Sequence, residues 1–235
     1  MADADAKPKK NADLPVRIAS AVVMLAVAGT ALWLGGWWWT AFAALVGLLC
    51  VAELLRLIAK LDFEPGLKFL LGAFGIFYVG YACWQLTQMP FLTALTAVSV
   101  VVATDVGAYF SGRAIGGPKI APSISPSKTW AGLAGGATLA AVLLLIGNVW
   151  LMAGKGAGAP LDIAFEGASL QSALVGVLLA VVAQSGDFFE SWLKRKAGVK
   201  DSSNLIPGHG GVFDRIDGLI PVVIVLPLIG GLNWT

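Results

Sequence analysis

The amino-acid sequence predicts an all-α integral membrane protein, a polytopic bundle of about seven transmembrane helices with a cytoplasmic N-terminus. Composition is the first reason: 57% of the 235 residues are hydrophobic and 13% are charged, whereas a soluble domain has about 45–50% apolar and about 25% charged residues. The second reason is a series of apolar runs, each near the roughly 20 residues that a helix needs to cross the hydrocarbon core. The third is the placement of basic residues between these runs.

Short polar or glycine-rich segments separate the apolar runs, and we expect one helix in each run. Helices are favoured because strands in lipid need a closed barrel with alternating polarity, and that alternation is missing. Gly35-Gly36 allows only a tight hairpin between the first two helices. The runs cover residues 17–35, 37–58, 67–86, 91–112, 131–153, 169–193 and 218–234.

The chain divides into three parts. Residues 1–15 are polar and carry several lysines, which predicts a disordered cytoplasmic tail. The first apolar run is longer than the apolar region of a usual signal peptide and has no clear cleavage site before Trp33, so we expect it to remain as a membrane helix. N-terminal transmembrane helices then occupy residues 16–98, and a C-terminal transmembrane region with polar loops occupies residues 99–235.

Basic residues gather on one side of the predicted membrane. Seven spans and a cytoplasmic N-terminus put the tail and the loops near 59–67, 113–130 and 194–217 inside. Every Lys and Arg except Lys155 then lies inside or at that interface. Cytoplasmic loops of membrane proteins carry such an excess of positive charge, so the asymmetry supports the topology. It also places the densest polar loops where nucleotides are available.

Charged groups within membrane spans are costly and usually functional. Four carboxylates qualify: Glu53, Asp105, Asp187 and Glu190. Glu53 stands three residues before Arg56, so we expect a local ion pair at the interface. Asp105 shares a helix face with Tyr109 and Gly112. It is either a hydrogen-bonding anchor between helices or part of the polar wall of a cavity open to the cytoplasm.

The sixth run ends in the segment AQSGDFFESWLKRK. Asp187, Ser191 and Lys194 are spaced i, i+4 and i+7 with Glu190 beside them, which places carboxylates and a cation on one helical stripe. Mg²⁺ takes hard oxygen ligands, typically one or two carboxylates plus substrate phosphates. The alternative is a solvated helix end with ion pairs, but it does not explain why Asp187 lies further into the span.

The segment IPGHGGVFDRIDG contains the only histidine of the chain. Its glycines would let backbone N–H groups approach an anion closely. His209 could act as a base, a ligand or a hydrogen-bond donor, and we favour a donor because a phosphate monoester is already largely ionised at pH 7. A glycine-rich turn with a structural histidine is the alternative. The polar residues and glycines of the segment are Gly208, His209, Gly210, Gly211, Asp214, Arg215 and Asp217.

A third polar segment, ISPSKTWAGLAGG, leads into the fifth run. Lys128 is a point charge suited to a phosphate, and the N-terminus of the following helix favours anions. The segment is not a Walker A loop, because the spacing GxxxxGK[ST] does not occur. A plain helix cap with a lysine that reaches the interface is the alternative.

Residues 191–217, SWLKRKAGVKDSSNLIPGHGGVFDRID, resemble the signature of the phosphatidate cytidylyltransferases, also called CDP-diacylglycerol synthases. Every fixed position of that signature is met. The segments SGD, DVGAYFSGR and SPSKTW also resemble this family, so the resemblance covers roughly residues 100–220. The matching residues are Ser191, Lys194, Arg195, Lys200, Asp201, Pro207, His209, Gly210, Gly211, Asp214, Arg215 and Asp217.

The resemblance implies transfer of CMP from CTP to phosphatidic acid with release of pyrophosphate, which makes residues 99–235 the catalytic region. It implies that Asp187 and Asp214 hold Mg²⁺ and a second, monovalent cation such as K⁺. Further candidate ligands are Glu190, Asp217 and Asp105. We also expect a homodimer in the bacterial inner (cytoplasmic) membrane, an active site at the cytoplasmic face and no nucleic-acid partner.

The residues themselves agree with such chemistry. Both reactants are anionic, so metal ions and basic side chains must neutralise their repulsion, while positioning supplies much of the remaining acceleration. We expect catalytic roles for Asp187, Lys200, His209, Asp214, Arg215 and Asp217. We expect substrate contacts from Arg113, Ser127, Lys128, Thr129, Ser191, Lys194, Arg195, Gly210 and Gly211.

Two other functions stay open at this point. The same fold could use CTP on another membrane lipid, such as a polyprenol or an archaeal-type lipid, because no feature of the sequence reads acyl-chain identity. A transporter would also carry carboxylates in the membrane, but it predicts charges towards both faces. Here the polar groups crowd one face.

Overall fold

A computed structural model arranges the chain as a bundle of long helices and describes residues 14–156, 164 and 167–229. Within these residues, six helices are long and apolar enough to cross a membrane. The all-α polytopic membrane fold is therefore confirmed. The six helices are α1 (Leu14–Leu34), α2 (Gly36–Ala59), α3 (Pro65–Gln88), α4 (Phe91–Ala114), α5 (Trp130–Gly154) and α7 (Gly167–Lys196).

The tight hairpin expected between the first two helices is present. Only Gly35 separates α1 from α2, and both Gly35 and Gly36 have positive φ angles, 63° and 48°. Residues with a Cβ rarely adopt this conformation, which explains the glycine pair. Nearly all of the predicted tail, residues 1–15, lies outside the described residues.

A glycine seam, formed by Gly107 of α4 and Gly135 and Gly136 of α5, brings these two helices into close contact. A Cβ added to Gly107 would lie 2.5 Å from the carbonyl oxygen of Gly135, and one added to Gly136 would lie 2.7 Å from that of Thr104. Association of membrane helices relies on such close packing between small residues. The two helices that carry the polar segments DVGAYFSGR and SPSKTW are thereby held side by side.

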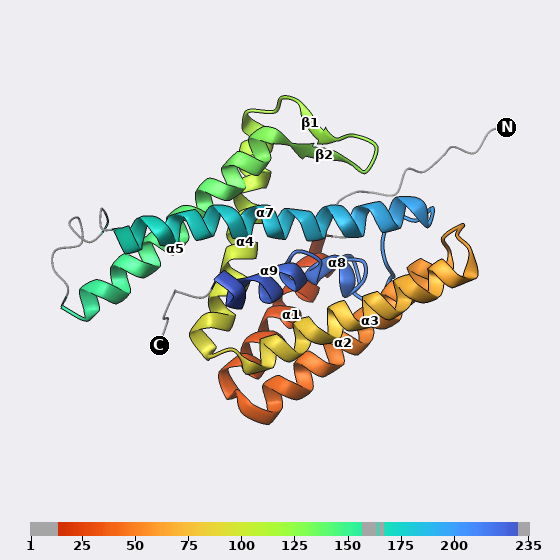
Figure 1. Cartoon of the computed structure of the whole chain (residues 1–235), viewed down its shortest axis with the longest axis horizontal. Helices are drawn as coiled ribbons and strands as arrows, with labels where there is room; N and C mark the ends of the chain where they lie inside the picture. The colour runs from red at the N-terminus through yellow and green to blue at the C-terminus, as the bar shows by residue number, and fades with distance from the viewer. Residues whose placement is uncertain (1–13, 157–163, 165–166, 230–235) are drawn as a thin grey trace.

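Helix α7 crosses the middle of the molecule (Figure 1). With 30 residues it is about 45 Å long, and the hydrocarbon core is about 30 Å thick. Helices α4 and α5 cross α7 and pack against it. The short helices α8 (Phe213–Ile216) and α9 (Leu219–Val225) lie between α7 and the α2–α3 pair. The chain thus returns to α7 after its polar loop, and this return places the loop beside the C-terminal part of that helix.

The seventh predicted span differs from the prediction. The run expected over residues 218–234 forms α9 followed by a 3-10 turn, η1 (Leu226–Ile229), and together they are shorter than the other six helices. Pro227 explains the change, because a proline cannot donate the backbone hydrogen bond that would continue an α-helix. Residues 230–235 lie outside the described part of the chain. The helices of spanning length among the described residues therefore number six and not seven.

A small hairpin of strands, which the sequence pattern did not predict, precedes α5. Strand β1 (Lys119–Ala121) pairs antiparallel with β2 (Ser125–Thr129). Figure 1 shows the hairpin projecting beyond the ends of α4 and α5. Strand β2 carries the residues SPSKT and leads directly into α5, so it sets the position of this polar segment.

Replacing Gly107 with Ala should destabilise the α4–α5 pair, because the added methyl group would meet three backbone atoms of α5 within 2.9 Å. Overpacking of this kind lowers the free energy of unfolding by about 1 to 3 kcal/mol. Thermal unfolding in detergent measures the effect. Gly147→Ala is the matched control, since a Cβ at this α5 position meets nothing within 4 Å. Equal melting temperatures for the two variants would contradict the role of the glycine seam.

Candidate active site

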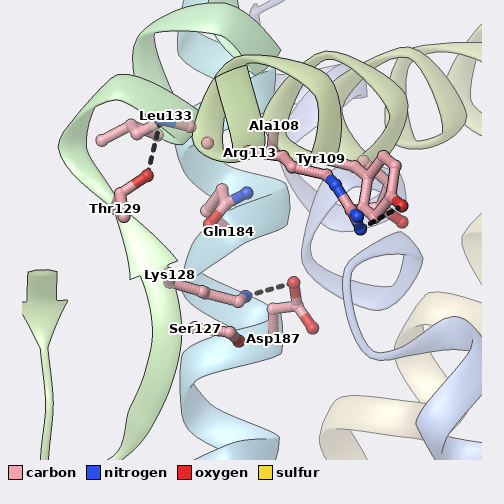
Figure 2. A pocket seen from close by; sticks show the side chains of 12 residues that line it. Ala108, Tyr109, Arg113, Ser127, Lys128, Thr129, Leu133, Gln184 and Asp187 are labelled. Atoms are coloured by element: carbon pink, nitrogen blue, oxygen red, sulfur yellow. Dashed lines mark hydrogen bonds and ion pairs between the residues drawn. The ribbon is translucent and has the colours of Figure 1, made fainter. Parts of the chain in front are cut away.

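A cavity of about 350 Å³ opens between α4, β2, the first turn of α5, and α7. Figure 2 shows residues of β2 facing α7 across it, with Arg113 and Tyr109 of α4 at another side. Asp105 belongs to the wall, which agrees with the second of its two interpretations. The lining residues are Asp105, Ala108, Tyr109, Gly112, Arg113, Ser127, Lys128, Thr129, Gly132, Leu133, Gln184 and Asp187.

Lys128 spans the cavity from β2 to α7. Its ammonium group forms an ion pair with Oδ2 of Asp187 and lies 4.7 Å from the ring centroid of Phe188. The side chains of Lys128 and Asp187 are 17% and 28% exposed, so the ion pair is partly open to the cavity. An anion can therefore approach Lys128, and a cation can approach Asp187, from the same space.

The two residues that flank Lys128 have different roles: Thr129 caps α5, whereas Ser127 faces the cavity. Oγ1 of Thr129 accepts a hydrogen bond from the N–H of Gly132 at 3.0 Å and caps α5, as the capping alternative predicted. The side chain of Ser127 is exposed and lines the cavity. Arg113 is also exposed, and its Nη1 donates to the hydroxyl of Tyr109 at 3.2 Å. Arg113, Ser127 and Lys128 are therefore available to a ligand in this cavity.

Asp214 occupies a second polar centre, where α8 meets the end of α7. Nζ of Lys194 lies 2.7 Å from Oδ1, and the N–H groups of Gly211 and Ser202 donate to Oδ2 at 2.7 and 3.0 Å. Burial alone would raise the pKa of Asp214. Its hydrogen bonds with Glu190, Lys194 and Gly211 outweigh burial and hold that pKa below its usual range. Asp214 is therefore a charged carboxylate at neutral pH.

Lys194 balances two buried carboxylates. It forms ion pairs with Glu190, one helical turn earlier, and with Asp214, and the side chains of these partners are only 2% and 5% exposed. Oε1 of Glu190 is buried without a hydrogen-bond partner among the described residues. One ammonium group thus bridges Glu190 and Asp214, and the pair with Glu190 is of the kind that the ion-pair alternative for this helix end describes.

Asp217 links the two polar centres. Its carboxyl group lies within hydrogen-bonding reach of Asp187 and interacts electrostatically with Glu190, which in turn contacts Asp214. Burial raises the pKa of Asp217, and the negative charge of Asp187 raises it further. The approach depends on Gly186, since a Cβ there would collide with the carbonyl oxygen of Asp217. Acidic groups from α7 and from the loop before α9 therefore converge.

The carboxylates of the two polar centres determine how a metal ion could be bound. Within the described residues no group of three or more His, Cys, Asp or Glu side chains is arranged to hold a metal ion. Mg²⁺ nevertheless needs only one or two carboxylates when phosphates and water complete its shell. Asp187 lines the cavity with its Oδ2 paired to Lys128, and Asp217 lies next to it with its Oδ1 accepting from the N–H of Gly218. The oxygens of Asp214 are engaged by Lys194, Ser202 and Gly211, so a metal ion at any of these carboxylates would compete with a partner within the chain.

The HGG segment packs tightly against other parts of the chain. The N–H of Gly211 donates to Asp214, and a Cβ on Gly211 would collide with Oγ of Ser202 and Oε2 of Glu53. The carbonyl oxygen of His209 accepts from Nε and Nη2 of Arg215 at 3.1 and 2.7 Å. Nδ1 of His209 is buried without a partner among the described residues. In this structure the glycine and Arg215 thus fold the loop around Asp214.

Glu53 corrects one of the sequence-based interpretations. The expected ion pair with Arg56 is wrong: Glu53 is only 2% exposed and accepts hydrogen bonds from the loop, while Arg56 is exposed. Its donors lie 149 to 160 residues further along the chain, beyond the reach of a local pattern. They are Ser202 Oγ, Ser203 Oγ, and the N–H groups of Val212 and Phe213.

Comparison with known proteins decides the family. The model of the cytidylyltransferase family matches residues 65–231, well over half of the chain. The chain belongs to the cytidylyltransferase family. The match begins earlier than residue 100, where the resemblance noted in the sequence begins.

Curated relatives in this family cover part of the chain at substantial identity. A phosphatidate cytidylyltransferase of Brucella suis biovar 1 (strain 1330) is 42% identical over 166 residues, which are 68% of this chain and 57% of the relative. One of Pseudomonas aeruginosa is 40% identical over 158 residues, 64% of this chain and 53% of the relative. One of Bacillus subtilis (strain 168) is 38% identical over 153 residues, 65% and 47% of the two chains. The chain thus spans about half the length of the curated relatives it matches.

Three signature residues of this cytidylyltransferase-family chain form no hydrogen bond with either polar centre among the described residues. They are Ser191, Arg195 and Lys200. Nε of Arg195 donates to the carbonyl oxygen of Ile124 at 3.3 Å and fastens the β-hairpin to α7. Lys200 is exposed, and the structure gives neither it nor Ser191 a side-chain hydrogen bond within its described residues. The predicted residues that the two centres bring together are Asp105, Arg113, Ser127, Lys128, Thr129, Asp187, Glu190, Lys194, Gly210, Gly211, Asp214 and Asp217.

Two polar residues of the site were missed by the sequence analysis. Gln184 is buried in the cavity wall, almost one helical turn before Asp187. A polar side chain inside an apolar run was the available signal, the same one that identified the four carboxylates. Ser202 contacts both Glu53 and Asp214, but it stands in a polar segment where no sequence feature distinguishes it from Ser203.

Replacing Lys194 with Met should destabilise the protein strongly, because two nearly buried carboxylates would lose their common cation. Removal of one partner from a buried ion pair costs about 3 to 5 kcal/mol. The thermal unfolding midpoint in detergent is the measurement. Lys196→Met, at an exposed position two residues further, should leave the midpoint nearly unchanged. A Lys194 variant as stable as the Lys196 variant would show that Lys194 does not balance these carboxylates.

Proposed function

We propose that this chain transfers CMP from CTP to phosphatidic acid, giving CDP-diacylglycerol and pyrophosphate. The observation that carries the proposal is the convergence of two charged centres, Lys128–Asp187 and Lys194–Asp214, through Asp217 at the end of α7. Relatives named phosphatidate cytidylyltransferases at 38 to 42% identity support the choice of substrates.

The reaction needs positive charge next to an open space. A phosphate oxygen of the lipid attacks the α-phosphorus of CTP, and the bond to the β-phosphate breaks, so that pyrophosphate leaves with the electron pair. Lys128 and Arg113 present positive charge at the cavity, where they can bind and orient phosphate groups. Ser127 adds a hydroxyl group on the same strand as Lys128.

We propose Asp187 and Asp217 as the carboxylates that would hold Mg²⁺, which would supply charge neutralisation to the phosphates. Asp214 is the other ligand implied by the family signature. Glu190, beside Asp214, and Asp105, in the cavity wall with Asp187, are further candidates. Since Lys194 already pairs with Asp214, Lys194 and a second, monovalent cation such as K⁺ would be alternative partners of that carboxylate. Lys200, His209 and Arg215 keep their proposed catalytic roles.

We propose that the site faces the cytoplasm in a bacterial inner membrane. The end of the bundle that holds the site also carries the basic residues of α2, α4 and α7, as cytoplasmic ends do. The homodimer is proposed from the family resemblance alone.

Purified protein in detergent should convert labelled CTP and phosphatidic acid into CDP-diacylglycerol when Mg²⁺ is present. A panel of four nucleoside triphosphates and several lipid phosphates, including a polyprenyl phosphate, tests both specificities together. We expect product only with CTP and preferentially with phosphatidic acid. Folded protein that forms no CDP-lipid from any member of the panel would contradict the proposal.

Asp214→Asn should lose turnover by at least about 100-fold, more than the loss typical for groups that only support a metal ligand. The protein should still fold, because Lys194 keeps Glu190 as a partner and the amide oxygen can accept from the loop N–H groups. The NH₂ group then faces Lys194, so a lower melting temperature than that of the wild type is expected. Initial rates and thermal unfolding in detergent measure the two effects. Asp62→Asn, at an exposed loop position, is the control that should retain activity. High activity in the Asp214 variant would remove Asp214 from the proposed machinery.

A further inference from the structure

Glu53 of α2 is a buried carboxylate that the proposed chemistry does not use. Its oxygens accept four hydrogen bonds at 2.6 to 3.0 Å. None of the described Lys and Arg residues forms an ion pair with it. A buried carboxylate is costly unless donors satisfy it, so this arrangement stabilises one particular fold of the loop.

Each oxygen of Glu53 holds one backbone group and one hydroxyl group. Oε1 accepts from the N–H of Val212 at 3.0 Å and from Ser203 Oγ at 2.6 Å. Oε2 accepts from the N–H of Phe213 at 2.8 Å and lies 2.8 Å from Ser202 Oγ, whose single proton it shares with Oδ2 of Asp214 at 3.0 Å. The carboxylate therefore joins residues 202–203 to residues 212–213, two segments that flank the HGG turn.

The same two segments hold Asp214. The N–H groups of Ser202 and Gly211 donate to Oδ2 of Asp214. Ser202 also contacts Glu53 through its hydroxyl group, and Gly211 directly precedes Val212, which donates to Glu53. Phe213, which precedes Asp214, is 1% exposed and packs in one apolar cluster with Leu54 and Leu57 of α2. The position of Asp214 is thus fixed by groups that are themselves fixed by Glu53 and its neighbours on α2.

We propose that Glu53 is a positioning residue of the active site: it fastens residues 202–203 and 212–213 to α2, so that Asp214 is held at the end of α7. Its effect on turnover rests on the proposed function, whereas its effect on the loop does not. Within the described residues, the hydrogen bonds of Glu53 go to the loop and not to the residues that line the cavity, so it acts through the loop.

Replacing Glu53 with glutamine tests whether these hydrogen bonds need two acceptor oxygens. A glutamine side chain has one oxygen and one NH₂ group in place of two acceptor oxygens. The hydroxyl groups of Ser202 and Ser203 can rotate to accept, but the N–H groups of Val212 and Phe213 cannot. In either orientation the NH₂ group would face one of these two N–H groups. Glu53→Gln should therefore release one segment of the loop although it preserves size and shape.

The experiment compares Glu53→Gln with Glu64→Gln, the same change at an exposed position before α3. Hydrogen–deuterium exchange of the full chain in detergent should become faster over residues 200–216 in the Glu53 variant alone, with α4 and α5 unchanged. The kcat for CDP-lipid formation should fall about 10- to 100-fold, as for removal of a group that orients a ligand. The Glu64 variant should match the wild type in both measurements.

The outcomes separate the two proposals. A wild type that forms no CDP-lipid contradicts the proposed function, while the exchange data still test the role of Glu53 in the loop. Wild-type exchange over residues 200–216, or faster exchange spread evenly over all helices, would overturn the positioning role. If Glu53→Gln does not fold, Ser203→Ala removes one donor only and should give a smaller, equally local increase in exchange. Unchanged exchange in that variant would then overturn the proposal.

Discussion

A carboxylate buried among membrane helices costs several kcal/mol unless a cation or hydrogen-bond donors surround it. This cost organises the cytidylyltransferase-family fold, because the donors come from distant parts of the chain. Lys128 reaches Asp187 from β2, and Lys194 joins Asp214 to α7. Glu53 draws the loop after α7 back to α2. The acidic groups therefore fix the relative positions of β2, α7, α2 and the loop after α7, which non-directional apolar packing alone would not specify.

Glycine makes these long-range contacts geometrically accessible. Gly186 lets the backbone of Asp217 lie against α7, and Gly211 lets the loop lie against Glu53 and Ser202. A Cβ at either position would push apart the groups that must meet. The glycine seam does the same for α4 and α5, whose ends carry Arg113 and Lys128. Close backbone packing at these glycines thus brings hydrogen-bond donors near the buried carboxylates. The carboxylates then hold the donors in place through hydrogen bonds and ion pairs.

Sequence patterns predicted the parts of this arrangement that depend on local periodicity. Six apolar runs became helices of spanning length. Of the four carboxylates in these runs, Asp105 and Asp187 line the cavity, Glu190 pairs with Lys194, and Glu53 binds the loop. The rest depends on contacts that spacing does not encode. Glu53 was assigned to Arg56 because helical neighbours are the only partners visible in a sequence. The glycines of the HGG segment were expected to let N–H groups approach an anion, and the sequence does not reveal that the N–H of Gly211 meets the carboxylate of Asp214. The β-hairpin has no alternating pattern, and Pro227 shortened the last helix in a run that hydropathy alone would extend.

The N-terminal helices have a larger part in the site than their apolar composition indicates. Glu53 precedes residue 65, where the family match begins, yet it binds the loop inside the matched region. Helix α1 contacts the same loop, because the hydroxyl of Ser20 lies 2.9 Å from the carbonyl oxygen of Pro207. Membrane helices that only filled the bilayer would need no polar contact with a loop so distant in sequence. The loop around Asp214 therefore takes its shape from α1 and α2 as well as from its own signature, and changes in those helices should alter the position of Asp214 through it.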